Sequence, residues 1–455
     1  MRVTEMSGDT RMFTELVRVF EEAGLLYCML AGYDGYPDSI PSDIDFMVAP
    51  GDAARLPRII GSVAARCGSH LIQCIRHETT AAYFVLARVD GAALAYLHPD
   101  SSGDYRRRGR FWLKAADVLA RRRRHAQGFW VPAAADAFAY YLIKKIDKGR
   151  IEPQQAAELS ARWREDPAGA RHAVCALLPE REAGMIENAA ASGDWSAVTG
   201  TIATLRDALH GHATAGSFGE RVAQFVAEMR RIAERIVHPT GMSLVFLGPD
   251  GCGKSSVIER VSAQLAPAFR RVRYQHLRPG VLSRRRGGHV VVTEPHAQPA
   301  RGRAGSVLKL VHFWADYVVG GLCWLFPLRV RSTLVIFDRY YHDLLADPRR
   351  YRYGAPLAWA RALGRLVPQP DLAFVLDAPP DVVLSRKQEV SRAEAARQRM
   401  AYLRVAREFR DVRIIDAALP LDQVVAAVLR HVVDHLEAGA TVRLGIPPVV
   451  QVAPR

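Results

Sequence analysis

Short apolar runs alternate with longer helical stretches in the second half of the chain. The runs are rich in β-branched residues and do not alternate strictly between apolar and polar positions. The expected strands are Ser243–Leu247, Val272–His276, Val290–Thr293, Leu334–Phe337, Leu372–Leu376 and Val412–Ile415. Such runs are typical of strands that helices cover on both faces of a parallel sheet. The pattern predicts an α/β domain with a three-layer parallel sheet over residues 241–438.

The first 130 residues show a mixed pattern. A helix is expected over Met12–Ala23. Short apolar runs, separated by Gly, Pro, Asp and Ser, follow at Leu26–Leu30, Ile44–Val48, Ala82–Leu86 and Ala93–Leu97. This pattern predicts a small α+β domain over residues 1–130.

Residues 131–240 are rich in Ala and Arg and have helical periodicity, as in Ala134–Ile146 and Phe218–Val237. They show little strand signal, so we expect a helical region that links the two domains. The cluster His238-Pro239-Thr240-Gly241 ends this region. Residues 439–455 are expected to form an irregular tail.

The composition fits a soluble globular protein of two or three domains. The chain has 455 residues, of which 49% are hydrophobic and 24% are charged. Its formal net charge of +15 favours acidic ligands such as nucleotide phosphates, nucleic acid or an anionic membrane surface. Only seven of the 62 basic residues are Lys, so genomic base composition explains the excess of Arg equally well.

The six cysteines are scattered, with no CxxC pair and no zinc-ligand spacing. This indicates reduced thiols in a cytoplasmic protein, without a disulfide framework. The N-terminus carries acidic residues throughout, unlike a signal peptide. The most membrane-like segment, Val307–Leu328, is interrupted by Lys309, His312 and Asp316, which favours a buried helix over a transmembrane span.

A phosphate-binding motif lies between an expected strand and an expected helix. Its residues are Gly248-Pro249-Asp250-Gly251-Cys252-Gly253-Lys254-Ser255-Ser256, which satisfy G-x-x-x-x-G-K-[ST]. The glycines allow the backbone N–H groups to wrap around an anion at a helix N-terminus. Lys254 would then neutralise the β- and γ-phosphates of ATP, and the Ser255 hydroxyl would bind Mg²⁺. We expect all of these residues except Pro249 to form the ATP site.

A second motif follows the strand Leu334–Phe337. Asp338 ends that strand at the edge where α/β sheets bind ligands, and Arg339 and Tyr340 come next. The carboxylate can hold Mg²⁺ through water or orient an acceptor, and the guanidinium suits a phosphate. The alternative is a helix-capping Asp beside an Arg that forms a surface salt bridge.

These motifs resemble the thymidylate kinase group of P-loop nucleoside monophosphate kinases. The resemblance also rests on Pro370–Asp377, Val382–Lys387 and the closing strand Ile414–Asp416, and it covers about 200 residues. It implies ATP binding by Gly253, Lys254 and Ser255, and catalysis and acceptor-phosphate binding by Asp338 and Arg339. It also implies that Asp250 approaches the sugar of the acceptor.

The stretch Arg386–Arg397 resembles the mobile lid of that family, which implies catalytic arginines such as Arg392 and Arg397. A solvated helix face is the alternative. The family's Thr-Arg-Glu-Pro-Gly segment has only partial matches here, His276–Gly280 and Val292–His296, with Arg284-Arg285-Arg286 between them. The acceptor site therefore cannot be copied from the family.

The segment Asp347–Gly354 adds basic and aromatic residues directly after the second motif. Arg349, Arg350 and Arg352 can clamp an anionic acceptor while tyrosines stack on a ring, or they can form a basic surface loop. We expect acceptor binding by Asp250, Arg339, Tyr340, Arg349 and Arg352. The acceptor is a nucleoside monophosphate, or a sugar or glycan.

The beginning of the chain resembles the nucleotidyltransferase fold. Leu30-Ala31-Gly32-Tyr33 is followed by Asp43 and Asp45, two residues apart on one strand, as two-metal chemistry requires. Tyr33 replaces the Ser of the family's turn, and the later strand Ala93–His98 contains no acid, since Asp90 and Asp100 only flank it. We therefore favour a degenerate binding or scaffold domain over a working transferase, and a pair of surface aspartates in a turn is the third option.

The sequence predicts a P-loop kinase with ATP as co-substrate and Mg²⁺ as cofactor, acting on a small-molecule phosphate acceptor. The alternatives are a nucleotidyltransferase that uses the first domain and a non-catalytic nucleotide-sensing module. We expect neither a nucleic-acid partner nor a transmembrane segment, and the sequence leaves the oligomeric state open.

Overall fold

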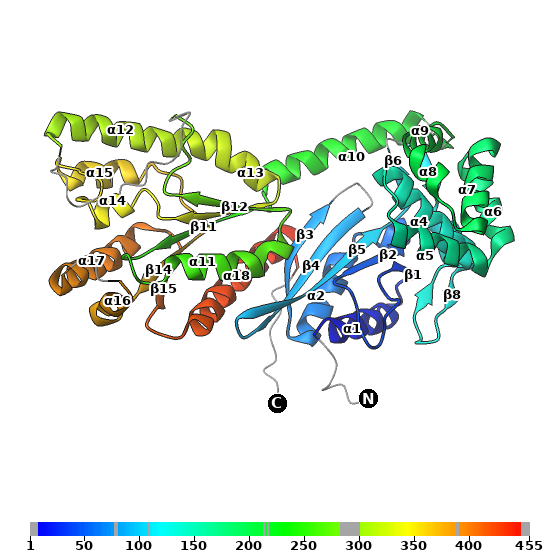
Figure 1. The fold of residues 1–455 in the computed structure, drawn as a ribbon, viewed down its shortest axis with the longest axis horizontal. Coiled ribbons are helices and arrows are strands. Elements are labelled where there is room, and N and C mark those ends of the chain that lie inside the picture. Colours follow the sequence, from blue (N-terminus) through cyan, green and yellow to red (C-terminus); the bar gives the residue numbers. More distant parts are fainter. Residues whose placement is uncertain are drawn as a thin grey trace. The chain divides into compact units, whose positions relative to one another are not determined.

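The computed structural model describes residues 8–76, 81–107, 110–212, 214–215, 218–282, 301–387 and 391–446. The chain forms two compact units (Figure 1). The first lies within Met1–Leu86, Tyr96–Ala233 and Ala440–Arg455, and the second within Ala87–Ala95 and Glu234–Gly439. The first unit therefore includes most of the mixed region and of the helical region expected from the sequence, apart from Ala87–Ala95 and residues 234–240.

The second unit is built on a parallel sheet of five strands in the order β12-β13-β11-β14-β15. The strands are β11 (Met242–Leu247), β12 (Arg271–His276), β13 (Thr333–Asp338), β14 (Leu372–Asp377) and β15 (Val412–Asp416). They confirm the α/β prediction and correspond to five of the six expected strands. The sixth, Val290–Thr293, lies outside the described residues, as do Val292–His296 and Arg284-Arg285-Arg286.

Helices cover both faces of this sheet. They are α11 (Lys254–Leu265), α12 (Arg303–Gly320), α13 (Phe326–Val330), α14 (Asp343–Ala346), α15 (Leu357–Gly364), α16 (Pro380–Arg386), α17 (Arg392–Val405) and α18 (Leu421–Leu444). Val245 and Leu247 of β11 share a core with Phe313 of α12 and Tyr402 of α17. Because side chains alternate along a strand, Leu244 and the other intervening residues face the opposite side, where α11 packs (Figure 1). The central strands are thus buried on both faces.

The membrane-like segment forms α12, one π-helical turn over Gly321–Leu325, and α13. The charged residues inside it face the unit: Asp316 accepts hydrogen bonds from the backbone N–H groups of Gly280 and Leu282, both at 2.8 Å. Its other side is open, with Leu308 74% and Leu322 68% exposed. In the described part of the chain, only Arg303–Val330 is long and apolar enough to cross a membrane, and 33% of its most apolar window is buried.

The first unit contains a second sheet of five strands, in the order β1-β2-β5-β4-β3. The strands are β1 (Tyr27–Ala31), β2 (Asp43–Val48), β3 (His70–Arg76), β4 (Ala81–Asp90) and β5 (Ala93–Ser102), with helices α1 (Gly8–Glu22) and α2 (Leu56–Cys67). β2 is antiparallel to β1 but parallel to β5. Short strands follow at β6 (Tyr105–Arg107), β7 (Arg110–Leu113), β8 (Arg123–Arg124), β9 (Trp130–Val131) and β10 (Thr214–Ala215), with α3 (Ala115–Arg121) between β7 and β8.

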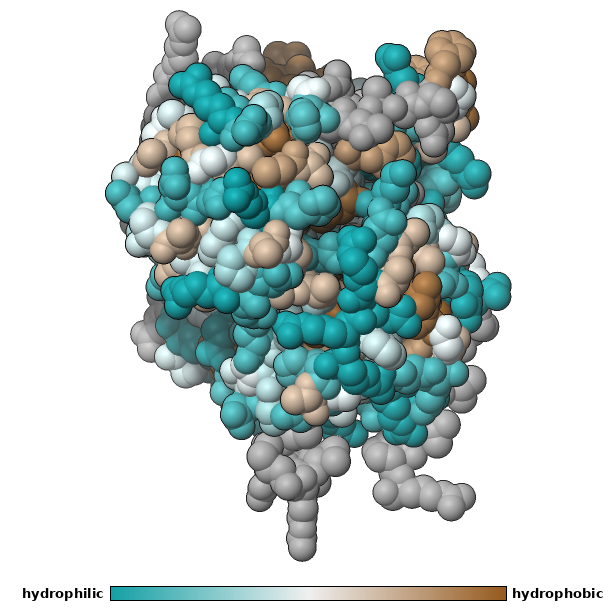
Figure 2. Space-filling view, turned by 90° about the vertical axis from the view of Figure 1, so that its right-hand side faces the viewer, coloured by the Kyte–Doolittle hydropathy of each residue, from teal (hydrophilic) through white to brown (hydrophobic). Residues whose placement is uncertain are grey.

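Six helices of the first unit form a bundle around a separate core. They are α4 (Ala134–Lys148), α5 (Pro153–Glu165), α6 (Pro167–Leu177), α7 (Glu180–Ser192), α8 (Ser196–Gly200) and α9 (Ile202–His212). Buried tryptophans anchor the bundle, and the indole N–H of Trp195 donates to the Ser160 hydroxyl at 2.9 Å. The face shown in Figure 2 is mostly hydrophilic, with apolar residues in small groups. Helix α10 (Phe218–Val237) follows, while α18 continues to Leu444, into the expected irregular tail.

Candidate functional site

The phosphate-binding motif forms the loop between β11 and α11. All six residues of β11, the central strand, are buried, so the chain leaves the middle of the sheet at Gly248. A Cβ at Gly248 would lie 2.8 Å from both the Cys252 Sγ and the carbonyl oxygen of Leu376, so this position requires glycine. Gly253 has a φ of +92° and caps the start of α11. The loop therefore presents the positive end of the α11 dipole at the carboxyl edge of the sheet.

The side chain of Lys254 folds back over this loop. Its Nζ donates hydrogen bonds to the carbonyl oxygens of Gly248, at 2.8 Å, and Pro249, at 2.9 Å. Ser255 and Ser256 are exposed at the beginning of α11. An ammonium group, two hydroxyls and the helix N-terminus thus meet at one loop, which is the chemistry that nucleotide phosphates and their Mg²⁺ require.

Asp250, inside the loop, lies at the centre of a charged cluster. Its carboxylate accepts hydrogen bonds from Arg339 and Arg350 and lies 3.8 Å from the Nζ of Lys254. The two arginine side chains are only 12% and 14% exposed. The acid in the loop therefore holds two guanidiniums beside the phosphate-binding residues, and its approach to the sugar of an acceptor stays a prediction. Sequence analysis considered Arg350 with its neighbours but did not single it out.

Asp338 ends β13 next to the loop, because Phe246 of β11 is its partner across the parallel pair. The Asp338 side chain is buried, and its Oδ2 accepts a hydrogen bond from the Tyr274 hydroxyl at 3.0 Å. Its Oδ1 is buried without a hydrogen-bond partner among the described residues. A buried carboxylate oxygen that lacks a partner is suited to a metal-bound water.

Arg339 has a left-handed backbone, with a φ of +73°, which turns its side chain toward the loop. Burial by itself would lower its pKa, but the carboxylates of Asp343 and Asp250 raise it above the ordinary value. The Nε of Arg339 lies 3.8 Å from Asp343 Oδ2. The guanidinium therefore remains charged in a largely buried position.

Asp343 itself is completely buried and links three segments. Its Oδ2 accepts a hydrogen bond from the Tyr351 hydroxyl, and its Oδ1 accepts one from the Tyr402 hydroxyl, both at 2.7 Å. Tyr351 belongs to the segment Asp347–Gly354 after β13, and Tyr402 belongs to α17, which begins in the lid-like stretch. Asp343 thus fixes these two segments relative to Arg339. The sequence offered the tyrosines of Asp347–Gly354 as stacking residues, but Tyr351 is buried against Asp343 instead, and no pattern pointed to Asp343 or Tyr402.

The two predicted lid arginines pair with acids near them in the chain. Arg392 contacts Asp381 at 2.8 Å, and Arg397 forms an ion pair with Glu394. The arginine of this stretch that lies beside the phosphate loop is Arg386, since a Cβ at Gly253 would be 3.8 Å from its Nη1. Arg386 also donates to the carbonyl oxygen of Ala417 at 3.0 Å. Residues 388–390, between α16 and α17, lie outside the described residues.

The other predicted acceptor residues, Tyr340, Arg349 and Arg352, interact with residues other than Asp250. Tyr340 is 2% exposed and donates its hydroxyl to the carbonyl oxygen of Pro368 at 2.7 Å, within the core. Arg349 acts electrostatically on Glu394 of α17. Arg352 lies near Lys309, and burial, together with Arg301, Arg278 and Arg352, lowers the pKa of Lys309 to about 8.

In the first unit, Asp43 and Asp45 lie on β2 as predicted. Asp43 accepts a hydrogen bond from the Tyr83 hydroxyl at 3.3 Å and lies 3.2 Å from the Nδ1 of His98, which is the largest cause of its lowered pKa. Asp45 forms an ion pair with Lys144 of α4. Sequence analysis did not single out Lys144.

The structure corrects one detail of this region, since the neighbouring strand does carry an acid. β5 continues past Pro99 to Ser102, so Asp100 is directly opposite Asp45 in the parallel register. Burial first, and then the carboxylate of Asp45, raise the pKa of Asp100 to about 7. The apolar run Ala93–Leu97 predicts a shorter strand, because the polar residues after it carry no strand signal. Even so, no group of three His, Cys, Asp or Glu residues in the described segments is arranged to hold a metal ion.

Comparison with known proteins supports a kinase-like region. No protein-family model matches the chain. The chain is 27% identical over 209 residues to the thymidylate kinase of Enterococcus faecalis. The aligned region covers 43% of this chain and 97% of that enzyme. It is 26% identical over 208 residues to the probable thymidylate kinase of Metallosphaera sedula, covering 42% of this chain and 92% of the relative.

A shorter match involves the probable thymidylate kinase of Pyrococcus abyssi, at 27% identity over 124 residues, or 24% of this chain and 57% of the relative. These matches say nothing of a nucleotidyltransferase, so the resemblance of residues 1–130 to that fold stays a prediction. Together with the parallel sheet, they confirm the coarser prediction that the chain contains a thymidylate kinase-like region.

Proposed function

We propose that the second unit is an ATP-dependent phosphotransferase that transfers the γ-phosphate to a nucleoside monophosphate or a related small acceptor. The observation that carries this proposal is the cluster at the phosphate-binding loop. Lys254, Arg339 and Arg350 gather around Asp250, next to a buried carboxylate oxygen of Asp338 that has no partner in the described chain. Positive groups arranged before the reaction stabilise a phosphoryl group in transfer.

In this proposal the Ser255 hydroxyl and, through water, Asp338 would hold Mg²⁺, which neutralises charge on the phosphate oxygens when it is bound. Lys254 exchanges the loop carbonyl oxygens for the β- and γ-phosphates. Arg339 and Arg350 bind the acceptor and offset the charge that develops as its oxygen bonds to phosphorus and ADP leaves. Arg386, beside Gly253, is a further candidate for the donor side.

The two guanidiniums held by Asp250 favour an acceptor that carries an anionic group. A nucleoside monophosphate meets this requirement, and so does a phosphorylated sugar or glycan. A neutral sugar does not use the bidentate geometry that arginine offers to phosphate. Phosphate-bearing acceptors are therefore the first to test.

The test is a screen for ADP release with nucleoside monophosphates, sugars and sugar phosphates. We expect turnover with at least one phosphorylated acceptor in the wild-type chain and in Asp43→Ala, but not in Lys254→Ala. Turnover with thymidylate alone would make this a thymidylate kinase in substrate as well as in sequence. ATP binding without ADP release on the whole panel would leave a nucleotide-sensing module instead.

Nucleotidyl transfer by the first unit is a second candidate, which the position of Asp100 beside Asp45 favours. It predicts pyrophosphate release that persists in Lys254→Ala and disappears in Asp45→Asn. The ion pair between Asp45 and Lys144 counts against it, because the ammonium group occupies one side of a carboxylate that a metal would need.

A further inference from the structure

A second ligand-sized cavity lies entirely within the first unit, apart from the carboxylates of β2. Its volume is about 550 Å³, which falls in the range of small-molecule sites. The cavity is lined by the loop after β1, the hairpin of β8 and β9, and the helices α4 and α5. Neither the phosphate-binding loop nor Asp43 and Asp45 line it, but Tyr33, which stands where the transferase family has Ser, does.

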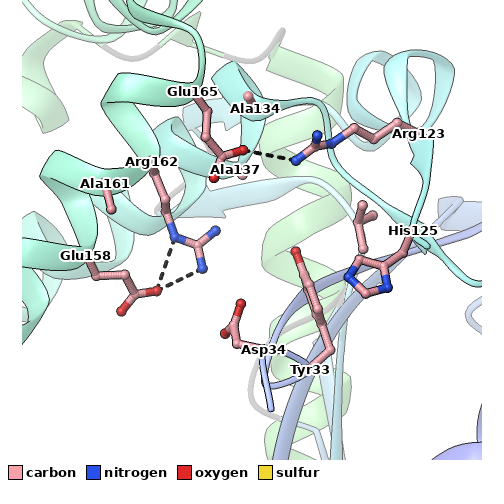
Figure 3. A pocket seen from close by; sticks show the side chains of 11 residues that line it. Tyr33, Asp34, Arg123, His125, Ala134, Ala137, Glu158, Ala161, Arg162 and Glu165 are labelled. Carbon is pink, nitrogen blue, oxygen red and sulfur yellow. Dashed lines mark hydrogen bonds and ion pairs between the residues drawn. The ribbon is translucent and has the colours of Figure 1, made fainter. Parts of the chain in front are cut away.

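Two nearly buried polar side chains face this cavity with unused hydrogen-bonding groups. Tyr33 and Arg162 are each 9% exposed. The Tyr33 hydroxyl has no hydrogen bond within the described chain, and burial raises its pKa to about 12. The Nε and Nη2 of Arg162 both donate to one oxygen of Glu158, at 3.1 and 2.8 Å, which leaves the Nη1 without a partner. Both groups reach the open space of the cavity (Figure 3), where a ligand can form hydrogen bonds with them.

Figure 3 shows these groups around one space. The guanidinium of Arg162, the carboxylate of Asp34 and the hydroxyl of Tyr33 point toward one another from α5 and from the loop after β1. On another wall, Arg123 pairs with Glu165 at 3.0 Å. The walls therefore offer both hydrogen-bond donors and carboxylate acceptors to one ligand.

The charges of the lining residues narrow the ligand class. Both guanidiniums are already paired with a carboxylate, Arg123 with Glu165 and Arg162 with Glu158. An anionic ligand would therefore meet compensated arginines beside the further carboxylate of Asp34, and a cationic ligand would meet two guanidiniums. A hydroxyl group fits best, since it donates to carboxylates and accepts from guanidinium and phenol groups.

The remaining walls suit a ring with one apolar face. Alanines of α4 and α5 and Val131 line the cavity, as do the rings of Tyr33 and His125, whose centroids are 5.6 Å apart. We propose that this cavity binds a neutral, hydroxyl-rich sugar ring, either a free sugar or the terminal residue of a glycan. This inference does not depend on the proposed kinase reaction.

The test is ligand-observed saturation-transfer NMR on the full chain. The probes are glucose, galactose, N-acetylglucosamine and maltotriose, with glucose 6-phosphate and glucosamine as charged analogues and thymidine as a nucleoside. We expect saturable binding of at least one neutral sugar, with weaker binding of its charged analogues. Stronger binding of maltotriose than of glucose identifies a glycan end, and the reverse identifies a free sugar. Preference for thymidine or a charged analogue, or no binding of any neutral sugar, overturns the proposal.

Variants link the binding to the cavity. Tyr33→Phe removes only the unpaired hydroxyl, and we expect the Kd to rise about three- to tenfold, the effect of one hydrogen bond. Tyr36→Phe is the matched control, because Tyr36 lies outside the cavity and its hydroxyl contacts Thr14 at 3.2 Å. An equal Kd in wild type and Tyr33→Phe would exclude this cavity as the site.

A second pair of variants tests the cavity even if Tyr33→Phe does not fold. Asp34→Asn changes an exposed cavity residue, and Asp38→Asn changes an exposed acid of the same loop outside the cavity. We expect only the first change to weaken sugar binding. Because the site is separate from the phosphate loop, sugar binding should persist unchanged in Lys254→Ala, whatever that variant does to ADP release.

Discussion

The carboxylates of the two units have opposite electrostatic surroundings. At the phosphate loop, Asp250 is surrounded by Arg339, Arg350 and Lys254. In the first unit, Asp100 lies opposite Asp45 across a parallel strand pair, and the pKa of Asp100 rises to about 7 through burial and this neighbour.

The site of the second unit is therefore mainly cationic, and that of the first unit is mainly acidic. In the second unit, guanidinium groups and an ammonium group are already positioned to stabilise a bound phosphate. Adjacent acids in the first unit repel each other, and Lys144 supplies the opposite charge within the protein. The variants below test this contrast, in order of decreasing expected effect.

Lys254→Ala should reduce ADP release by about a thousandfold or more, because it removes the ammonium group that lies over the phosphate loop, 3.8 Å from Asp250. Steady-state ADP release with the best acceptor measures this loss. Asp43→Ala in the first unit is the control and should retain wild-type turnover. Equal losses in both variants would mean that the two sites do not act separately.

Asp338→Asn should lower kcat about a hundredfold while leaving ATP binding within a fewfold of wild type. The amide keeps the shape of the side chain but removes the charge that a metal-bound water needs. Tyr274→Phe is the milder companion, since it removes only the 3.0 Å hydrogen bond to Oδ2. A similar kcat in Asp338→Asn and wild type would remove this carboxylate from the mechanism.

Acid should destabilise the second unit through His342. Burial lowers the pKa of His342 to about 4, from 6.5 in the unfolded chain. Below pH 6.5 the unfolded chain gains a proton that the folded unit does not bind until about pH 4. Stability is therefore lost as pH falls through this window, by up to about 3 kcal/mol. Calorimetry of wild type and His342→Gln measures the effect, and an unchanged pH slope in the variant would assign it to other groups.

Lys144→Met should destabilise the first unit by about 1–3 kcal/mol, because it leaves Asp45 and Asp100 without their cation. Lys148→Met, one turn along α4, removes an exposed lysine whose electrostatic effect on Asp100 is smaller than that of Lys144, and it should change stability by less than about 0.5 kcal/mol. Urea unfolding of the full chain compares the two. Equal stability of both variants would show that the acids do not need this partner.

Tyr402→Phe should have the smallest effect, about 1 kcal/mol in stability, through loss of one hydrogen bond to Asp343. If Asp343 positions Arg339, the same variant should also raise KM for the acceptor more than KM for ATP. Tyr353→Phe is the control, since its hydroxyl donates to the carbonyl oxygen of Pro356 instead. A stability change without a selective change in acceptor KM would make the network structural only.

Sequence patterns predicted the central strands of the second unit because β11, β13 and β14 are short apolar runs buried on both faces. They also predicted the phosphate loop, since its spacing carries its own geometry. They failed at Asp100, which the apolar run up to Leu97 placed outside the strand, whereas parallel pairing with β2 extends β5 to include it. Arg386 lies in a segment that resembles the family, but the sequence predicted Arg392 and Arg397 as the catalytic lid arginines instead. A dense run of charged residues does not show which side chain lies beside the phosphate-binding loop.

The sequence by itself determined the order of the elements, the phosphate loop and the carboxylate that ends β13, because these depend on spacing within a few residues. Only the tertiary structure decided which arginines meet Asp250, that Asp343 joins Tyr351 and Tyr402, and that Tyr33 and Arg162 share a cavity. These contacts join residues from 8 to 129 positions apart along the chain. Local patterns cannot specify them, because they depend on how strands and helices pack.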